Sequence, residues 1–245
     1  MARIFIEPGR IKEYSATLPE GDAKKLLRVL RMNPGDSITL FDGVREYSGI
    51  IKSLNQRSAE VSITEILENA RDSRLHILLG QGAPKSEKLE YVVQKATELG
   101  AAEITPVILE RSVKRPDAAD AGKKISRLRK IAVEASRQSG RVSVPEISCF
   151  MDLPMFLERA SRYDLKIIFY EGDTHGLREI LNGCGAVNSI AILVGPEGGF
   201  TDDEALEAEA AGFVRAGLGP RILRTETAGL AALSIIQYEL GDIGG

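Results

Sequence analysis

The sequence has few cysteines, few histidines and no long hydrophobic run. Its 245 residues include two cysteines and two histidines, all scattered, so no metal site and no disulfide framework is expected. The longest clean apolar run, residues 190–194, is far shorter than the ~18–20 residues of a membrane span. The first ten residues, MARIFIEPGR, lack the basic and then apolar layout of a secretory signal. We therefore expect a cytoplasmic protein without metal or membrane attachment.

An excess of basic charge is also missing. Lys and Arg number 32 against 35 Asp and Glu, which gives a net charge of −3. Taken alone, this balance argues against a partner as acidic as nucleic acid. With 43% hydrophobic and 27% charged residues, the composition is that of a globular protein, and disordered or fibrous architectures are excluded.

The first 70 or so residues predict a small β-rich domain. Residues 60–64 alternate polar and apolar side chains, as a half-buried strand does. Residues 37–41 and 47–51 are two further β-rich runs, and Asp42-Gly43 between them is a turn signal. We expect a small barrel or curled sheet over residues 1–70.

One short helix, residues 24–31, is expected within this β-rich domain. Leu26, Leu27 and Leu30 are spaced to form an apolar stripe. The opposite side carries Lys24, Arg28 and Arg31. A polar stretch at 68–74 then indicates a linker.

The rest of the chain, residues 74–245, alternates predicted strands and helices. Strands are expected at 75–79, 103–107, 166–170, 190–194 and 213–218. Helices are expected at 86–99, 121–139, 153–161, 202–211 and 225–240. This alternation predicts an α/β domain around a mostly parallel sheet.

The turn GQGAPKS at 80–86 has some features of a phosphate-binding P-loop. The P-loop needs glycine before its lysine so that backbone amides can surround a phosphate. Here that position holds Pro84, which has no N–H group to donate. A plain strand–helix turn is the better interpretation, and a nucleotide-dependent enzyme is an alternative.

Two later turns are better candidates for a ligand site. The first, GPEGGF, follows the strand expected at 190–194. Its glycines Gly195, Gly198 and Gly199 would let the backbone approach a small molecule. A simple tight turn without a ligand would have the same sequence pattern. Thr201 and Glu204 have the spacing of a helix capping box.

The second turn, GLGPRILRTETA, follows the strand expected at 213–218. Thr225 is expected to cap the next helix. Polar residues between two buried elements are costly unless they serve a ligand or pair with one another. Arg221, Arg224 and Glu226 therefore form either part of a site or a local ion-pair network.

GPEGGF followed by LGPRILRTETA resembles the C-terminal signature of the RsmE-type ribosomal RNA (uridine-N3) methyltransferases of the SPOUT superfamily. VQKATELG at 93–100, EASRQSGR at 134–141 and RVLR at 28–31 with FDG at 41–43 fit the same family in the same order. One departure concerns a histidine that the family often has shortly before VLR. Here Lys24 and Lys25 stand in that region, and no role of the histidine is transferred.

The resemblance implies a trefoil-knotted SPOUT methyltransferase domain at 74–245 behind a PUA-like RNA-binding barrel at 1–70. It further implies a homodimer and S-adenosyl-L-methionine as cofactor, bound in the loops of the knot. The implied cofactor residues are Phe169, Tyr170, Glu171, Gly195, Pro196, Glu197, Gly198, Leu218, Gly219, Ile222, Leu223, Thr227 and Ala228.

The implied reaction is methylation of N3 of a specific uridine in 16S ribosomal RNA, within the small ribosomal subunit. Arg224 or Arg221 would stabilise the developing uridine anion, and Glu226 or Glu197 would take the proton. Methylation of a ribose 2′-hydroxyl or of tRNA, and a non-catalytic RNA-binding relative, are alternatives.

The local charge pattern supports an RNA partner, although a basic face that is exposed only to solvent would show the same pattern. Basic residues at 111–141 greatly outnumber acidic ones, and they include Lys114 and Arg115. On the helix expected at 121–139, the apolar face holds Ile125, Leu128, Ile131, Ala132 and Ala135. The expected RNA contacts are Lys24, Arg28, Arg31, Lys123, Arg127, Lys130, Arg137 and Arg141. The net charge is thus an average of these basic segments and an acidic helix at 202–211.

Overall fold

The computed structural model describes residues 2–67, 72–112, 117–172 and 174–244, which pack into two units. One unit contains residues 1–72 and 136–144, and the other contains 73–135 and 145–245. The boundary expected near 70–74 falls partly on residues 68–71, which lie outside the described part. Segment 136–144 groups with the first unit, although the sequence pattern assigns it to the second.

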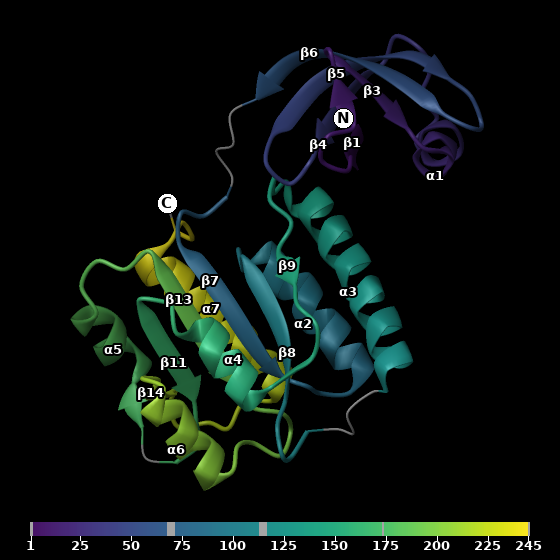
Figure 1. Ribbon diagram of the computed structural model, residues 1–245. Coiled ribbons are helices and arrows are strands. Elements are labelled where there is room, and N and C mark those ends of the chain that lie inside the picture. Colours follow the sequence, from purple (N-terminus) through teal and green to yellow (C-terminus); the bar gives the residue numbers. More distant parts are fainter. Residues whose placement is uncertain (1, 68–71, 113–116, 173, 245) are drawn as a thin grey trace. The chain divides into compact units, whose positions relative to one another are not determined.

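The first unit is built on a six-stranded sheet in the order β1-β4-β5-β6-β3-β2 (Figure 1). Its strands are β1 (Ala2–Phe5), β2 (Ile11–Lys12), β3 (Ser15–Leu18), β4 (Ser37–Phe41), β5 (Glu46–Leu54) and β6 (Ala59–Leu67). Neighbouring strands are antiparallel except for β1 and β4. In β6 the alternate residues Ala59, Val61 and Ile63 are buried, which is the period-2 pattern of a half-buried strand. The predicted β-rich domain is confirmed.

The helix expected at 24–31 begins earlier and changes its geometry. It starts as α1 (Glu20–Lys24) and continues as a π-helical turn, η1 (Lys25–Val29). This wider turn redirects the side chains: Leu26 is fully buried, whereas Leu30 is 39% exposed. The predicted stripe was therefore wrong at Leu30, because its spacing assumed α-helical geometry. Lys24 forms an ion pair with Glu20, while Arg28 and Arg31 are exposed.

Segment 136–144 is held in the first unit by Arg3 on β1. Its guanidinium donates to the carbonyl oxygens of Ser136 at 3.0 Å and Arg141 at 2.7 Å, and its Nε lies 2.7 Å from Glu46 Oε1. Arg141 itself is buried, with its Nε 3.1 Å from Asp72 Oδ1. The expectation that Arg141 faces RNA does not fit this burial, since its charge is used inside the unit.

The second unit contains an eight-stranded sheet whose neighbouring strands are all parallel. The main order is β10-β8-β7-β13-β11-β14-β12, and β9 also pairs with β8. The strands are β7 (His76–Gly82), β8 (Glu103–Ile108), β9 (Glu146–Ile147), β10 (Met151–Asp152), β11 (Leu165–Phe169), β12 (His175–Gly176), β13 (Ser189–Val194) and β14 (Val214–Gly217). The helices are α2 (Ser86–Glu98), α3 (Ala118–Ser139), α4 (Leu153–Ala160), α5 (Leu177–Gly183), α6 (Asp202–Ala210) and α7 (Thr225–Leu240).

All five strands and five helices expected in this unit are present, with small shifts at their ends. The elements that the sequence pattern missed are β9, β10, β12 and α5, which are too short to show a hydrophobic period. The parallel α/β fold is confirmed. The described helices include none with the length and apolar character that a membrane crossing requires.

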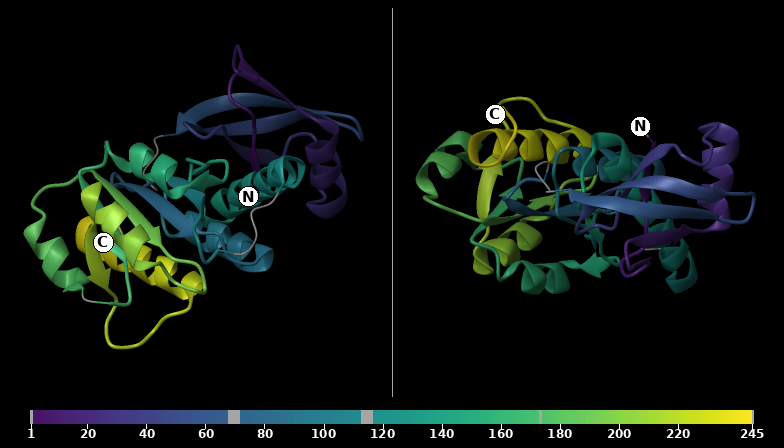
Figure 2. Two further views of the ribbon diagram at one scale, coloured as in Figure 1. Left: turned by 60° about the horizontal axis from the view of Figure 1, so that its bottom comes forward. Right: turned by 90° about the horizontal axis from the view of Figure 1, so that it is seen from above.

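Helices cover both faces of the sheet, as the right-hand view of Figure 2 shows. On one face, α4 and α6 pack on a cluster that includes Leu78, Phe156 and Leu193. On the other face, α7 crosses β7 and β13. Apolar burial on both faces explains why strands such as β13 read as nearly continuous apolar runs.

The glycines of the P-loop-like turn serve this packing. A Cβ added at Gly80 would lie 2.3 Å from the Phe156 ring, and one at Gly82 would lie 2.5 Å from the backbone nitrogen of Pro196. The turn thus has glycine because neighbouring groups approach its backbone closely. This argues against the nucleotide-binding alternative.

Candidate functional site

A cavity of about 820 Å³ lies at the carboxyl ends of β11, β13 and β14. Its size is within the roughly 300–1,000 Å³ of small-molecule sites, and this end of a parallel sheet is where α/β proteins bind ligands. Three segments supply most of the lining: 169–172, 194–200 and 216–225. The three turns that end these strands therefore form one site.

Most of the residues expected at the cofactor line this cavity. They are Phe169, Tyr170, Glu171, Gly195, Pro196, Glu197, Gly198, Leu218, Gly219, Ile222, Leu223 and Ala228. Thr227 is exposed and lies outside the lining. Of the expected catalytic residues, Arg221 and Arg224 line the cavity, whereas Glu226 does not.

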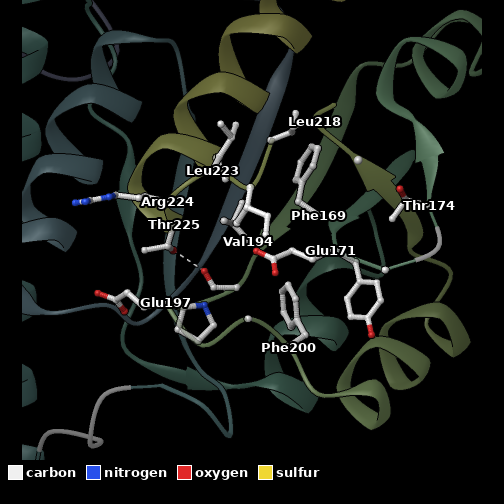
Figure 3. A pocket seen from close by; sticks show the side chains of 18 of the residues that line it. Phe169, Glu171, Thr174, Val194, Glu197, Phe200, Leu218, Leu223, Arg224 and Thr225 are labelled. Carbon is white, nitrogen blue, oxygen red and sulfur yellow. Dashed lines mark hydrogen bonds between the residues drawn. The ribbon is translucent and has the colours of Figure 1, made fainter. Parts of the chain in front are cut away.

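The cavity combines apolar walls with the carboxylate of Glu171. In Figure 3, Glu171 extends between Phe169 and Phe200, while Leu218 and Leu223 lie above it. Arg224 and Glu197 extend together to the opposite side, away from Phe169. The interior thus suits a ligand with an apolar ring and a positive charge, and further charged groups surround its rim.

The backbone of the GPEGGF turn is held by the side chain of Arg111 and by a capping box at the start of α6. Arg111 Nη1 donates to the carbonyl oxygens of Gly198 at 3.1 Å and Phe200 at 3.0 Å. At the start of α6, the Thr201 hydroxyl accepts from Glu204 N, and Glu204 Oε2 accepts from Thr201 N. The predicted capping box is confirmed, and it fixes the point at which the turn ends and α6 begins.

Tyr170 braces the wall formed after β11. Its hydroxyl donates to Asp202 Oδ1, and the Arg215 guanidinium lies 4.9 Å from its ring centroid. The hydrogen bond to Asp202 is the main reason that the pKa of Tyr170 is raised above its ordinary value. Its side chain therefore ties this wall to α6.

Thr225 connects the two turns but does not cap its helix. The N-cap of α7 is Arg224, and Thr225 is the first helical residue. Its buried hydroxyl donates to the carbonyl oxygen of Gly195 (Figure 3) and accepts from Gln81 Nε2 at 2.8 Å. The predicted cap was wrong because the hydroxyl pairs with another turn. Gln81 was also missed, although a glutamine in an otherwise apolar strand was a usable signal.

Removing the Thr225 hydroxyl should show how much this connection contributes to the stability of the protein. We expect Thr225→Val to lower the free energy of unfolding by about 1–3 kcal/mol, because it leaves a buried carbonyl and a buried amide without their partner. Urea denaturation measures the change. Thr227→Val, at an exposed position, is the matched control and should stay within about 0.5 kcal/mol of the original protein. Equal effects of the two substitutions would contradict the connection.

Lys88 on α2 joins two carboxylates at the rim of the cavity. Its Nζ lies 3.1 Å from Glu197 Oε1 and 3.2 Å from Glu226 Oε2. Burial alone would raise the pKa of both carboxyls, but backbone hydrogen bonds and Lys88 outweigh it and lower them. The bonds to Glu197 and Glu226 raise the pKa of Lys88. Glu226 is thus in an ion pair, but its partner is Lys88, which the sequence pattern missed, and not Arg221 or Arg224 as the alternative expected.

The predicted two faces of α3 are confirmed. Ile125, Leu128, Ala132 and Ala135 are buried, and Ile131 is half-buried. Lys123, Arg127 and Lys130 are exposed, and Arg137 is half-buried. Arg127 also lies 2.8 Å from Glu90 Oε1. Lys114 and Arg115 lie outside the described residues. An exposed row of cations therefore follows α3, while its other face joins the core.

Sequence comparisons find family models and a curated relative that together match most of this chain. A family model described as an RNA methyltransferase domain matches residues 71–237, and one described as an RNA methyltransferase PUA domain matches 19–64. A ribosomal RNA small subunit methyltransferase E of Bacillus subtilis is 35% identical, with 98% of this chain and 97% of the relative covered.

Solved structures agree with the sequence relatives. A ribosomal RNA small subunit methyltransferase E of Neisseria gonorrhoeae, bound to S-adenosyl methionine, is 33% identical with a TM-score of 0.89, and 99% of each chain is covered. A Legionella pneumophila protein in complex with the cofactor SAM is 34% identical with a TM-score of 0.90, and 98% of each chain is covered.

Proposed function

Because this chain belongs to the ribosomal RNA small subunit methyltransferase E family, we propose that it methylates N3 of a specific uridine in 16S ribosomal RNA, with S-adenosylmethionine as methyl donor. The observation that carries the proposal is the cavity formed by the turns after β11, β13 and β14. Two similar proteins of known structure, those of Legionella pneumophila and Neisseria gonorrhoeae, were solved with this cofactor bound. A trefoil knot, a homodimer and a cytoplasmic location complete the proposal and stay predictions.

The residues of the cavity fit this cofactor. S-adenosylmethionine supplies an electrophilic methyl group on a positively charged sulfur. The Glu171 carboxylate provides the negative charge that such a ligand needs in a partly apolar site. Leu218, Ile222 and Leu223 offer apolar surface for an adenine ring, and the backbone of the turn at Gly195 offers hydrogen-bonding groups.

The groups at the rim fit the chemistry of the RNA substrate. N3 of uridine carries a weakly acidic proton, so negative charge develops on the uracil ring as this proton leaves, and transfer of the methyl group to N3 then neutralises it. Arg224 and Arg221 line the cavity and would stabilise that charge from a fixed position. Glu226 and Glu197 are the candidates for accepting the proton. Their lowered pKa values make them weak bases, which favours Arg-assisted loss of the proton over strong general-base catalysis.

RNA would be held by the basic residues described above, of which Lys24 is paired with Glu20 and Arg137 is half-buried. In the first unit these are Lys24, Arg28 and Arg31, and on α3 they are Lys123, Arg127, Lys130 and Arg137. Contacts of this kind bind phosphates whatever the base sequence. The target base itself must leave its stack or be unpaired already, which costs a few kcal/mol at most.

The α3 cations predict a specific salt dependence. Replacing Lys123 and Lys130 together by alanine should reduce the slope of log K against log salt by about 2, since each phosphate contact releases about one counterion. Filter binding of ribosomal RNA at several salt concentrations measures this slope. Arg178→Ala, which removes an exposed cation on α5, should leave the slope unchanged. An unchanged slope in the double variant would remove α3 from the RNA interface.

The reaction itself is tested by mapping modified nucleosides in cells that lack the gene. We expect N3-methyluridine to disappear from small-subunit RNA and to return when the gene is restored. Loss of a ribose 2′-O-methyl group or of a tRNA modification would instead support one of the alternatives. An unchanged set of modifications in all RNAs would overturn the enzymatic proposal.

A further inference from the structure

Two sets of contacts tie the turn after β13 to the first turn of α7. The inner set is buried and runs from Gln81 through the Thr225 hydroxyl to the carbonyl oxygen of Gly195. The outer set lies at the rim and runs from Glu197 through Lys88 to Glu226. In both sets the donor belongs to neither of the two turns: Gln81 and Lys88 both lie on the continuous segment that runs from β7 to α2. This segment therefore holds the same two cavity walls at two depths.

The outer set depends on charge more than the inner one. One ammonium group within 3.2 Å of two carboxylates brings two like charges close together. Such charges repel each other once the cation is removed. The side chain of Lys88 is 29% exposed and that of Glu226 is 17% exposed, so water only partly screens this repulsion. Arg224 also helps to hold the Glu226 carboxyl ionised, whereas Lys88 is the cation that bridges it to Glu197.

We propose that Lys88 is a positioning residue that keeps the two walls of the cavity at the separation the cofactor requires. It acts through Glu197 on the turn that carries Gly195 and through Glu226 on the turn that follows Arg224. A phosphate-binding role suits it less, because its ammonium group is already shared by two carboxylates. This role rests on the proposed function, since it takes S-adenosylmethionine as the ligand of the cavity.

The test compares four variants with the original protein. Lys88→Met keeps the stem and removes the charge, and Lys88→Arg keeps the charge. Lys88→Met combined with Glu197→Gln and Glu226→Gln removes the whole charged set. The matched control is Lys95→Met, which breaks an ion pair with Glu98 on the same helix α2. Calorimetry measures the affinity for S-adenosylmethionine, and hydrogen exchange without ligand measures the opening of segments 195–201 and 225–229.

We expect Lys88→Met to weaken the affinity about tenfold and to speed exchange in both segments by about the same factor, the size of a typical coupling between contacting charged groups. Lys88→Arg should stay within about threefold of the original protein in both measurements, and the triple variant should do so in hydrogen exchange, since neither contains unbalanced carboxylates. Lys95→Met should match the original protein in both measurements.

Two results would overturn the proposal. One is Lys88→Met with the affinity and exchange of Lys95→Met. The other is a triple variant whose hydrogen exchange is as fast as that of Lys88→Met, which would show that the balance between Lys88 and the two carboxylates does not hold the walls. If Lys88→Met does not fold, the triple variant decides: exchange within about threefold of the original protein supports the proposal, and exchange about tenfold faster overturns it. An original protein that binds no S-adenosylmethionine would contradict the proposed function, while the exchange measurement would still decide on Lys88.

Discussion

Replacing Arg224 by alanine is expected to lower kcat for methyl transfer about 100-fold, the effect of removing one preorganised donor from a developing anion. The affinity of the variant for S-adenosylmethionine should stay within a factor of about two of the original value, because the lost interaction is made only in the transition state. The reason is its position: Arg224 lines the cavity but extends away from Phe169 and the interior. Its guanidinium is thus available to an incoming base rather than to the bound cofactor.

Rate and binding have to be measured separately for this prediction. Single-turnover methylation of small-subunit RNA gives the rate, and calorimetry gives the cofactor affinity. Arg224→Lys should recover part of the rate, because lysine keeps the positive charge. It should not recover all of it, because lysine lacks the planar set of donors of the guanidinium. Arg178→Ala on α5 is the control for loss of an exposed cation. Wild-type rates in Arg224→Ala would show that Arg224 does not stabilise the anion, and Arg221 would become the candidate.

The second large effect is expected far from the cavity, at Glu103 at the start of β8. This buried carboxylate accepts hydrogen bonds from Tyr163 Oη at 2.8 Å, Arg159 Nε at 2.9 Å and Arg162 Nη2 at 3.1 Å, and His76 Nε2 lies 3.0 Å away. Glu103→Gln replaces one accepting oxygen by a donor that faces other donors. We expect a loss of about 3–5 kcal/mol in the free energy of unfolding, as for other broken buried ion pairs.

The pH dependence of stability gives this prediction its signature. Burial alone would raise the pKa of Glu103, but the bonds from His76, Tyr163 and Arg159 outweigh it and lower the pKa from 4.5 to about 2. Because the folded-state pKa is the lower one, the stabilisation is complete above the unfolded value and is lost as the pH falls towards about 2. A shift of this size corresponds to about 3 kcal/mol.

Urea denaturation between pH 7 and pH 2.5 should therefore show a steeper loss of stability for the original protein than for Glu103→Gln. Glu146→Gln is the matched control, since Glu146 also lies 2.8 Å from Arg159 but its side chain is 62% exposed. We expect the control to cost less than about 1 kcal/mol, the usual range for an exposed ion pair. Parallel pH profiles of the original protein and Glu103→Gln would contradict the role of this carboxylate.

The turns that form the cavity could be predicted from the sequence because their signal is local. Gly195, Gly198 and Gly199 stand directly after an apolar strand, and Thr201 with Glu204 marks the start of the next helix. The resemblance to a family then supplied which turns belong together. Strand and helix alternation was sufficient for the parallel sheet, since hydrophobic period and length separate the two element types.

The residues that join those turns could not be found in this way. Gln81 contacts a threonine 144 positions later, and Lys88 contacts Glu197 and Glu226. Such partners become neighbours only through the order of the strands. Charge alone was also insufficient to predict the role of Arg141. In the sequence, a basic residue in a basic segment has the same pattern whether it is exposed or buried against Asp72. At Leu30 the helical period failed because the turn is π-helical.

Segment 136–144 has a consequence for how such a protein can arise and be rearranged. The chain leaves the first unit after residue 72, returns to it at 136–144 and leaves it again. A fragment that ended at residue 72 would keep Arg3 but lose the carbonyl groups of Ser136 and Arg141 to which it donates. Joining the two units end to end by gene fusion would not reproduce this path. Residues 1–72 therefore form the complete β-rich unit only together with segment 136–144.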